Sequence, residues 1–281
     1  MSRLALTLLI PSLVPSLLLA CSNDADGTAE GTSSSTGDES SSSTTAPPTT
    51  TTGADTSSSS TTEVAESSET GPTTLSVSGV VSDFFLMGPI AFAQISLLDV
   101  PGFETAGNTD GTYSIDGLAP GSFQRIRLAG NLDYWGSIVP VALEDESIDD
   151  FDLSQVSTMV IDLQAEALRN QDPDVVVDEN AAVLLIAINQ NTATGATVHL
   201  DPPPLPSTYY APDANGSPVL DQDVIEWGLF PVAIFFNLPP GEAGTYTIDV
   251  THPERECVVE DPQPPTLERH INLVYVDCPS G

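Results

Sequence analysis

The stretch TDGTYSIDGLAPGSFQRIRLAG, residues 109–130, carries the pattern that decides the fold. Tyr113 and Ile115 alternate with polar neighbours, and a period of two residues is typical of a strand with one buried face. Asp110-Gly111 is a hairpin-type turn and Pro120-Gly121 a second turn, so this strand is bounded at both ends. A second strand follows. Its side chains are expected to point inward at Gln124, Ile126 and Leu128 and outward at Arg125 and Arg127.

The sequence before this stretch also alternates between apolar and polar residues. LSVSGVVS at residues 75–82 alternates in the same way, and IAFAQISLL follows at residues 90–98. Short strands that recur at roughly 8–12 residues, separated by Gly and Pro turns, are typical of antiparallel sandwiches. The chain is therefore predicted to be mainly β, with a first antiparallel β-sandwich over residues 75–150.

Four motifs in this region resemble the carboxypeptidase regulatory-like domain family. They are SGVVSD (78–83), GPIAFAQISL (88–97), NTDGTYSIDGLAPGSF (108–123) and DYW (133–135). The chain departs from the family at Phe92, where a small residue is usual, and at DYW, where the family has a Gly-Tyr pair. The resemblance implies a transthyretin-like, Ig-like β-sandwich and brings no catalytic residues with it.

An acidic segment and an amphipathic stretch follow this domain. The segment EDESIDDFD, residues 144–152, is expected to be a solvated linker, with a cation site as the alternative. Residues 151–173 are expected to form a short linking helix that Asp152 or Ser154 caps and Pro173 ends. Its apolar stripe follows spacings of three and four residues: Leu153, Val156, Val160, Leu163 and Ala167.

Residues 174–281 are predicted to form a second, divergent copy of the sandwich. The repeated positions are Ala93, Ile95, Leu97, Leu118, Pro120 and Gly121 in the first copy, and Ala196, Val198, Leu200, Leu238, Pro240 and Gly241 in the second. The extra length of the second copy lies in a Pro-rich loop at residues 201–227, and binding sites are often found on such loops. Tyr209, Tyr210 and Trp227 in this loop are candidate ligand contacts.

The N-terminal sequence predicts export and a lipid anchor. Residues 1–20, MSRLALTLLIPSLVPSLLLA, have a basic start and an apolar run that prolines interrupt, which favours a signal peptide over a spanning helix. Leu18-Leu19-Ala20-Cys21 resembles the lipobox of bacterial lipoproteins, whose leader is cut before the lipid-bearing cysteine. The resemblance implies lipidation of Cys21 and attachment to a membrane of the cell envelope. Ser22 favours the outer membrane or cell surface, and an ordinary signal peptide is the alternative.

The composition of residues 21–74 predicts a tether between the membrane and the folded domains. More than half of residues 22–74 are Ser or Thr, so the segment has little apolar surface to offset the entropy of ordering. A disordered tether is expected, with a glycosylated stalk as the alternative.

The charge of the chain excludes some partners and some kinds of catalysis. The formal charge is −34 and all six Lys and Arg residues are Arg. Such a charge repels nucleic acid, and the lack of Lys excludes Schiff-base catalysis and GxxxxGK phosphate loops.

The cysteines predict one disulfide, and no metal or cofactor site is expected. With Cys21 assigned to the lipid, Cys257 and Cys278 remain as a pair in an oxidising compartment. A bond between them closes a loop of 22 residues and would contribute about 3 kcal/mol. The sequence has no CxxC, HxH or HExxH spacing. Its histidines are His199, His252 and His270. His199 lies between Val198 and Leu200, so it is expected to face outward if they face the core.

Three functions remain open at this point. The first is a non-enzymatic surface lipoprotein with a structural or adhesive role, because the sequence has no GxSxG elbow or comparable catalytic arrangement. The second is a peptide- or glycan-binding module that uses the aromatic residues of the 201–227 loop. The third is a calcium-stabilised adhesin, which the acidic runs suggest. An enzyme is the least favoured class.

Overall fold

The computed structural model describes residues 74–279. Cys21, the leader and residues 22–73 of the expected tether lie outside the described residues. In the described part, no helix combines the length and the hydropathy needed to cross a bilayer. Strands predominate there, with the single helix α1 (Thr158–Arg169), so the predicted mainly β fold is confirmed.

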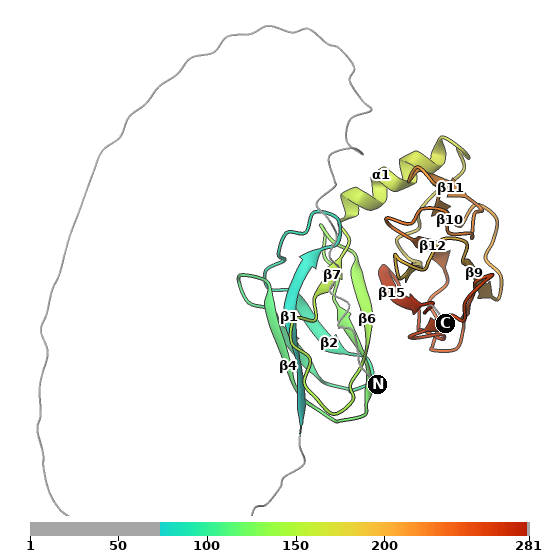
Figure 1. Ribbon diagram of the computed structural model, residues 1–281. Helices are drawn as coiled ribbons and strands as arrows, with labels where there is room; N and C mark the ends of the chain where they lie inside the picture. The colour runs from blue at the N-terminus through green and yellow to red at the C-terminus, as the bar shows by residue number, and fades with distance from the viewer. Residues whose placement is uncertain (1–73, 280–281) are drawn as a thin grey trace, which may run out of the picture. The chain divides into compact units, whose positions relative to one another are not determined.

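The first half is the predicted sandwich, drawn in blue to green in Figure 1. One sheet has the strand order β4-β1-β7, and the facing strands follow the order β6-β5-β2-β3. The pairing is antiparallel except that β7 runs parallel to β1. The strands are β1 (Leu75–Asp83), β2 (Gln94–Leu97), β3 (Glu104–Ala106), β4 (Thr112–Leu118), β5 (Phe123–Leu128), β6 (Gly136–Ala142) and β7 (Leu153–Gln155).

The alternating pattern placed the side chains of β4 and β5 on the correct faces. Tyr113 and Ile115 are buried in the core. The inward residues of β5 are also buried, namely Gln124, Ile126 and Leu128. The Asp110-Gly111 turn is not a hairpin, however, because β3 pairs with β2 whereas β4 pairs with β1. The turn carries the chain from one sheet to the other, and Gly111 provides the left-handed backbone it needs, at φ 83°.

The acidic segment at residues 144–152 is not a free linker, which corrects that prediction. It runs alongside β1, where the Ser78 backbone N–H donates to the Ile148 carbonyl at 2.9 Å. The Phe151 N–H donates in turn to the Ser78 carbonyl at 2.9 Å, and the Ser78 hydroxyl donates to the Asp149 carboxylate at 3.0 Å. The segment therefore continues the first sheet and leads directly into β7.

The second half contains the second sandwich. Its strands are β8 (Ala182–Ile188), β9 (Thr197–Asp201), β10 (Tyr209–Pro212), β11 (Pro218–Leu220), β12 (Val232–Leu238), β13 (Thr247–Thr251), β14 (Val258–Val259) and β15 (His270–Asp277). The larger group has the order β11-β10-β12-β8-β15, β14 pairs with β15, and β13 pairs with β9 in a separate sheet. β8, the continuous apolar run of the sequence, lies between β12 and β15 and is buried on both faces. Val183 and Leu185 pack into one hydrophobic cluster, and Leu184 and Ile186 pack into a second one.

Strand pairing supports the internal repeat. β1 pairs antiparallel with β4 and parallel with β7, and β8 pairs in the same two ways with β12 and β15. Likewise β2 pairs with β5, and β9 with β13. Leu118 and Leu238 end the equivalent strands β4 and β12, and Ile95 and Val198 are buried in the equivalent strands β2 and β9. The copies diverge at β10, which pairs with β12, whereas β3 pairs with β2.

The linking helix is shorter than the expected span of residues 151–173. Leu153–Gln155 form β7 because they pair with β1, so neither Asp152 nor Ser154 caps the helix. α1 follows Ser157 and ends before Asn170. The boundary was misplaced because alternating apolar residues at the start of the span fit a strand as well as a helix.

The buried face of α1 also differs from the predicted stripe. Ala165 and Leu168 are its buried residues, whereas Leu163 is 49% exposed. The chain after the helix attaches to β11, since the Gln171 side-chain amide donates to the Pro218 carbonyl at 2.7 Å and accepts from the Leu220 N–H at 3.1 Å. Figure 1 shows α1 in yellow beside β10 and β11.

The C-terminal strand β15 joins the two halves. It runs parallel to β8 on one side, and its residues 270–272 run parallel to β6 on the other. A single sheet therefore passes through both sandwiches. Gly136, the first residue of β6, makes this possible because a Cβ there would lie 2.4 Å from Cδ2 of His270.

Two arginines of β5 reinforce this junction. Arg125 binds the buried Asp261 carboxylate with two hydrogen bonds, Nε to Oδ2 at 2.7 Å and Nη2 to Oδ1 at 3.1 Å. Arg127 Nε donates to His270 Nε2 at 3.0 Å, and His270 Nδ1 lies 2.7 Å from the Glu268 carbonyl oxygen. Because Nε2 accepts a hydrogen bond, the proton lies on Nδ1 and the His270 ring is neutral.

The close approach at β1 gives a first prediction. A Cβ at Gly79 would lie 2.4 Å from the carbonyl oxygen of Phe151, which is backbone and cannot rotate away. We expect Gly79→Ala to lower the free energy of unfolding by about 2–3 kcal/mol, measured by chemical denaturation. Gly88→Ala is the matched control, because a Cβ there meets nothing within 4 Å. Equal stability of the two variants would contradict the proposed packing.

The junction predicts a pH dependence of stability. Burial lowers the pKa of His270 below its ordinary value of 6.5, and the charge of Arg127 lowers it further. The unfolded chain therefore takes up the proton first as the pH falls. We expect the free energy of unfolding to decrease below about pH 6.5, by at most about 1.4 kcal/mol per pH unit. His270→Gln should remove this dependence between about pH 6.5 and 5.

Candidate functional site

The segment at residues 201–227 is more ordered than the loop predicted from the sequence. It contains β10 and β11, which pair antiparallel with Tyr210 opposite Leu220 and Pro212 opposite Pro218. This hairpin extends the larger sheet of the second half beyond β12. The three aromatic candidates therefore lie in different environments and do not form one platform.

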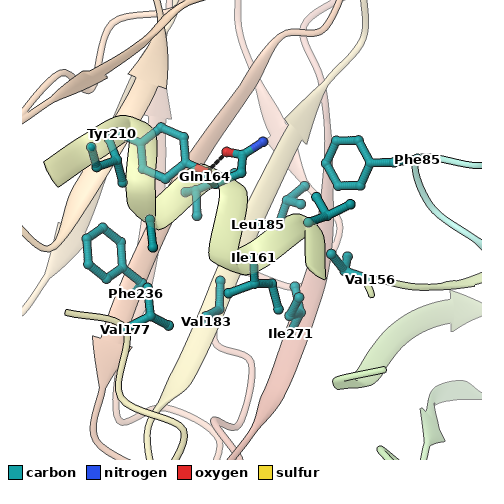
Figure 2. Close-up of a pocket in the computed structure, with 14 residues that line it drawn as sticks. Phe85, Val156, Ile161, Gln164, Val177, Val183, Leu185, Tyr210, Phe236 and Ile271 are labelled. Atoms are coloured by element: carbon teal, nitrogen blue, oxygen red, sulfur yellow. Dashed lines mark hydrogen bonds between the residues drawn. The ribbon is translucent and has the colours of Figure 1, made fainter. Parts of the chain in front are cut away.

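Tyr210 belongs to the core. Its side chain is buried, and its hydroxyl donates a hydrogen bond to Oε1 of Gln164 on α1, drawn as a dashed line in Figure 2. Its ring also packs against Phe236, with ring centroids 6.3 Å apart. Burial raises the pKa of the Tyr210 phenol far above its ordinary value. The candidate ligand contact at this position is therefore a structural contact between α1 and the sheet.

A small apolar cavity lies between α1 and the sheet beneath it. Figure 2 shows Ile161 pointing from the helix toward Val183 and Ile271 of the strands. The cavity holds about 60 Å³, roughly the volume of two water molecules. Apart from Gln164 and Tyr210, which bond to each other, its lining side chains are apolar. It is a packing gap that offers no chemistry.

Trp227 has a packing role as well. Its ring makes an edge contact with Phe230 at a centroid distance of 6.3 Å. Phe230 in turn contacts Phe84 and Phe85, which follow β1, at 5.6 and 6.1 Å. A Cβ at Gly216 would lie 2.9 Å from Trp227 Cζ2, so the indole also covers the β10–β11 turn. This aromatic cluster packs the segment that precedes β12 against the first half.

Tyr209 is the candidate that faces a groove. The groove measures about 190 Å³. Its lining residues are Val198, His199, Leu200, Pro203, Pro204, Tyr209, Asp223 and Phe235. Tyr209 is partly exposed and stacks on the buried ring of Phe235, with centroids 5.7 Å apart and planes 15° apart. The groove therefore has the aromatic ring of Tyr209 and the polar side chains of His199 and Asp223 in its lining.

Two carboxylates set the electrostatics of this groove. Asp223 Oδ2 lies 3.8 Å from His199 Nδ1. Partial burial raises the pKa of the Tyr209 phenol, and the negative charges of Asp221 and Asp223 raise it further. The phenol is therefore neutral at physiological pH, and none of the described residues that line the groove is an arginine.

The sequence did not identify His199, Asp223 and Phe235 as members of one site. The alternation around Val198 and Leu200 did predict that His199 points outward, and its side chain is 53% exposed. Asp223 reaches the groove because the Val198 N–H donates to the Asp223 carbonyl at 3.0 Å. The two residues are 25 positions apart, and the spacing in the sequence does not reveal that they are neighbours.

The remaining candidate residues have structural roles. Cys257 and Cys278 form the predicted disulfide, which ties the chain before β14 to the end of β15. The described part of the chain has no group of three or more His, Cys, Asp or Glu residues that could hold a metal ion. His252 accepts a backbone hydrogen bond within its own turn, and His270 belongs to the junction.

Comparisons with known proteins give no family. No family model matches the chain, and no curated protein matches it. Among solved structures, the Bacillus anthracis TIE protein is 12% identical over 73% of this chain and 34% of its own, with a TM-score of 0.25. A streptococcal ancillary pilin is 12% identical over 74% and 63%, with a TM-score of 0.25.

The shaft pilin SpaA of Lactobacillus rhamnosus GG is 8% identical over 74% of this chain and 99% of its own, with a TM-score of 0.24. The chain spans about a third of the TIE protein and under two thirds of the ancillary pilin. TM-scores this low carry no weight for function.

The role assigned to Tyr210 predicts a stability effect. Tyr210→Phe removes the hydroxyl that binds Gln164 and leaves the amide oxygen without its donor. We expect the free energy of unfolding to fall by about 1–2 kcal/mol. Tyr209→Phe, at the partly exposed neighbour, should change it by less than about 0.5 kcal/mol. Thermal and chemical denaturation check both values, and a larger effect at Tyr209 would reverse the assignment.

Proposed function

We propose that the protein is a non-enzymatic lipoprotein of the cell envelope that displays two β-sandwich domains in a structural or adhesive role. The observation that carries this proposal is the order of the chain. The sequence Leu18-Leu19-Ala20-Cys21 is followed by a long polar stretch, and the first strand that the structure describes is β1. A diacylated or triacylated cysteine supplies enough buried methylene groups for stable membrane attachment.

The linker fits a role in display. Residues 22–74 have the composition of a flexible coil, which would span roughly 40 Å as a root-mean-square distance. Such a length carries a folded domain clear of the lipid headgroups, and Ser22 favours the outer membrane or cell surface as the location. The disulfide between Cys257 and Cys278 suits an oxidising compartment outside the cytoplasm.

Three positions of the SGVVSD motif support the resemblance of the first half to carboxypeptidase regulatory-like domains. Gly79 permits the backbone of the acidic segment to approach β1. Val81 is fully buried. Asp83 Oδ1 accepts the N–H groups of Phe85 and Leu86 at 2.9 and 2.7 Å, which closes the turn after β1. All three are structural roles, in keeping with a domain that brings no catalytic residues.

Two arginines at the junction of the halves also have structural partners. Arg125 and Asp261 bind each other, and Arg127 binds His270. These pairs hold the two halves together at the junction. Two domains joined in this way suit a structural or adhesive role at a surface.

A second candidate function is recognition of a peptide or glycan. The groove beside Tyr209 favours it, because a concave site with an aromatic wall and a few polar groups is the usual form of a binding site. The calcium-stabilised alternative has no comparable support. Asp149 and Asp152 of the acidic segment accept hydrogen bonds from Ser78 and Val80.

Lipidation can be tested on whole cells. Cells that express the full chain are fed an acyl-chain probe, and its incorporation is compared between wild type and Cys21→Ala. We expect labelling and membrane association of the wild type and neither for the variant, because the thiol is the attachment point. Cys257→Ala with Cys278→Ala is the control and should keep the label. Labelling that survives in Cys21→Ala would remove the anchor from the proposal.

A further inference from the structure

We propose that the groove beside Tyr209 binds the cationic side chain, arginine or lysine, of an extended peptide segment. This inference rests on the second candidate function and is independent of the lipid anchor. It names the chemical class of ligand and the residues that would select it.

The size of the groove suits one long side chain. Its volume of about 190 Å³ equals roughly six water molecules. A flat, extended glycan surface would need a longer row of aromatic rings. Here the stacked pair of Tyr209 and Phe235 is the aromatic element, and Phe235 is buried. Tyr209 therefore supplies the accessible ring.

The polar groups of the groove favour a positive guest. Asp223 is part of the lining, and its side chain is 36% exposed. Asp221 is close enough for its charge to raise the pKa of the Tyr209 phenol together with that of Asp223. An aromatic ring and a carboxylate both attract a guanidinium or ammonium group, and the two interactions reinforce each other at short range.

The protein does not provide a strong competing cation at this place. The chain has no Lys, and the described residues that line the groove include no Arg. His199 lies 3.8 Å from Asp223, beyond the distance of a good hydrogen bond, and is about half exposed. The net charge of −34 also draws basic peptides toward the protein and speeds their association.

The wall of the groove is formed before a ligand arrives. Pro203 and Pro204 have fixed φ angles. The chain after them is tied down where the Ser207 N–H donates to the Asp221 carboxylate at 2.7 Å and the Ser207 hydroxyl donates to Asp172 at 2.7 Å. A preformed wall reduces the entropy lost on binding.

The test uses three blocked tripeptides and the full chain in a non-ionic detergent. The peptides are Gly-Arg-Gly, Gly-Lys-Gly and Gly-citrulline-Gly, in which citrulline keeps the shape of arginine without its charge. Binding is followed by NMR, through chemical shifts of His199 and Tyr209. We expect the Arg and Lys peptides to bind with millimolar dissociation constants, and the citrulline peptide to bind at least about fivefold more weakly.

Two charge-matched variants separate the groove from the overall field of the protein. Asp223→Asn should weaken binding of the Arg peptide about fivefold, since one exposed ion pair contributes that much. Asp162→Asn, on the exposed side of α1, removes the same charge elsewhere and should leave the affinity unchanged. Circular dichroism of both variants checks that they are folded.

Several outcomes would overturn the proposal. They are equal binding of the citrulline and Arg peptides, equal weakening by the two variants, or no shift at His199 and Tyr209 with any peptide. Binding of a neutral oligosaccharide such as chitobiose at the same two residues would assign the groove to glycans instead. None of these results bears on the lipidation of Cys21, which the acyl-probe experiment tests by itself.

Discussion

Parallel pairing of the last strand with both halves is the constraint on which the rest of the described structure depends. β15 lies between β8 and β6, so the chain must be complete before either sandwich has its full set of neighbours. The Arg125–Asp261 pair and the Arg127–His270 hydrogen bond lie at the same seam. Breaking either contact would leave a polar group at the seam without its partner, so both contacts favour the observed pairing of the two halves.

The repeated strand pairing explains both what the halves share and where they differ. Each half is built on a central strand, β1 or β8, with one antiparallel and one parallel neighbour. The second half moves its extra strands, β10 and β11, to the edge beyond β12. That shift leaves Tyr209 beside β9, and the groove forms where the two sheets of the second half meet the Pro-rich segment. A structural divergence between two copies thus creates the candidate binding groove.

Prediction from the sequence succeeded where a local pattern is compatible with a single type of structure. Alternation placed Tyr113, Ile115 and His199 on their correct faces, and the count of cysteines identified the disulfide. Prediction failed where a pattern is compatible with two types of structure. Residues 153–155 fit a helix or a strand, and only the exposed edge of β1 selected the strand. The acidic segment at 144–152 looked like a linker because its backbone bonds to β1 have no sequence signal.

The sequence by itself determined the strand-rich fold and the faces on which the side chains of β4 and β5 lie, because these follow from neighbouring residues. The tertiary structure decided which strands pair, that β15 serves both halves, and that Tyr210 is buried in the core while Tyr209 lines a groove. It also decided that Trp227 packs against Phe230. The physical reason is that pairing and burial depend on groups far apart along the chain. Adjacent tyrosines with equal propensities therefore take different roles according to which neighbour the fold supplies.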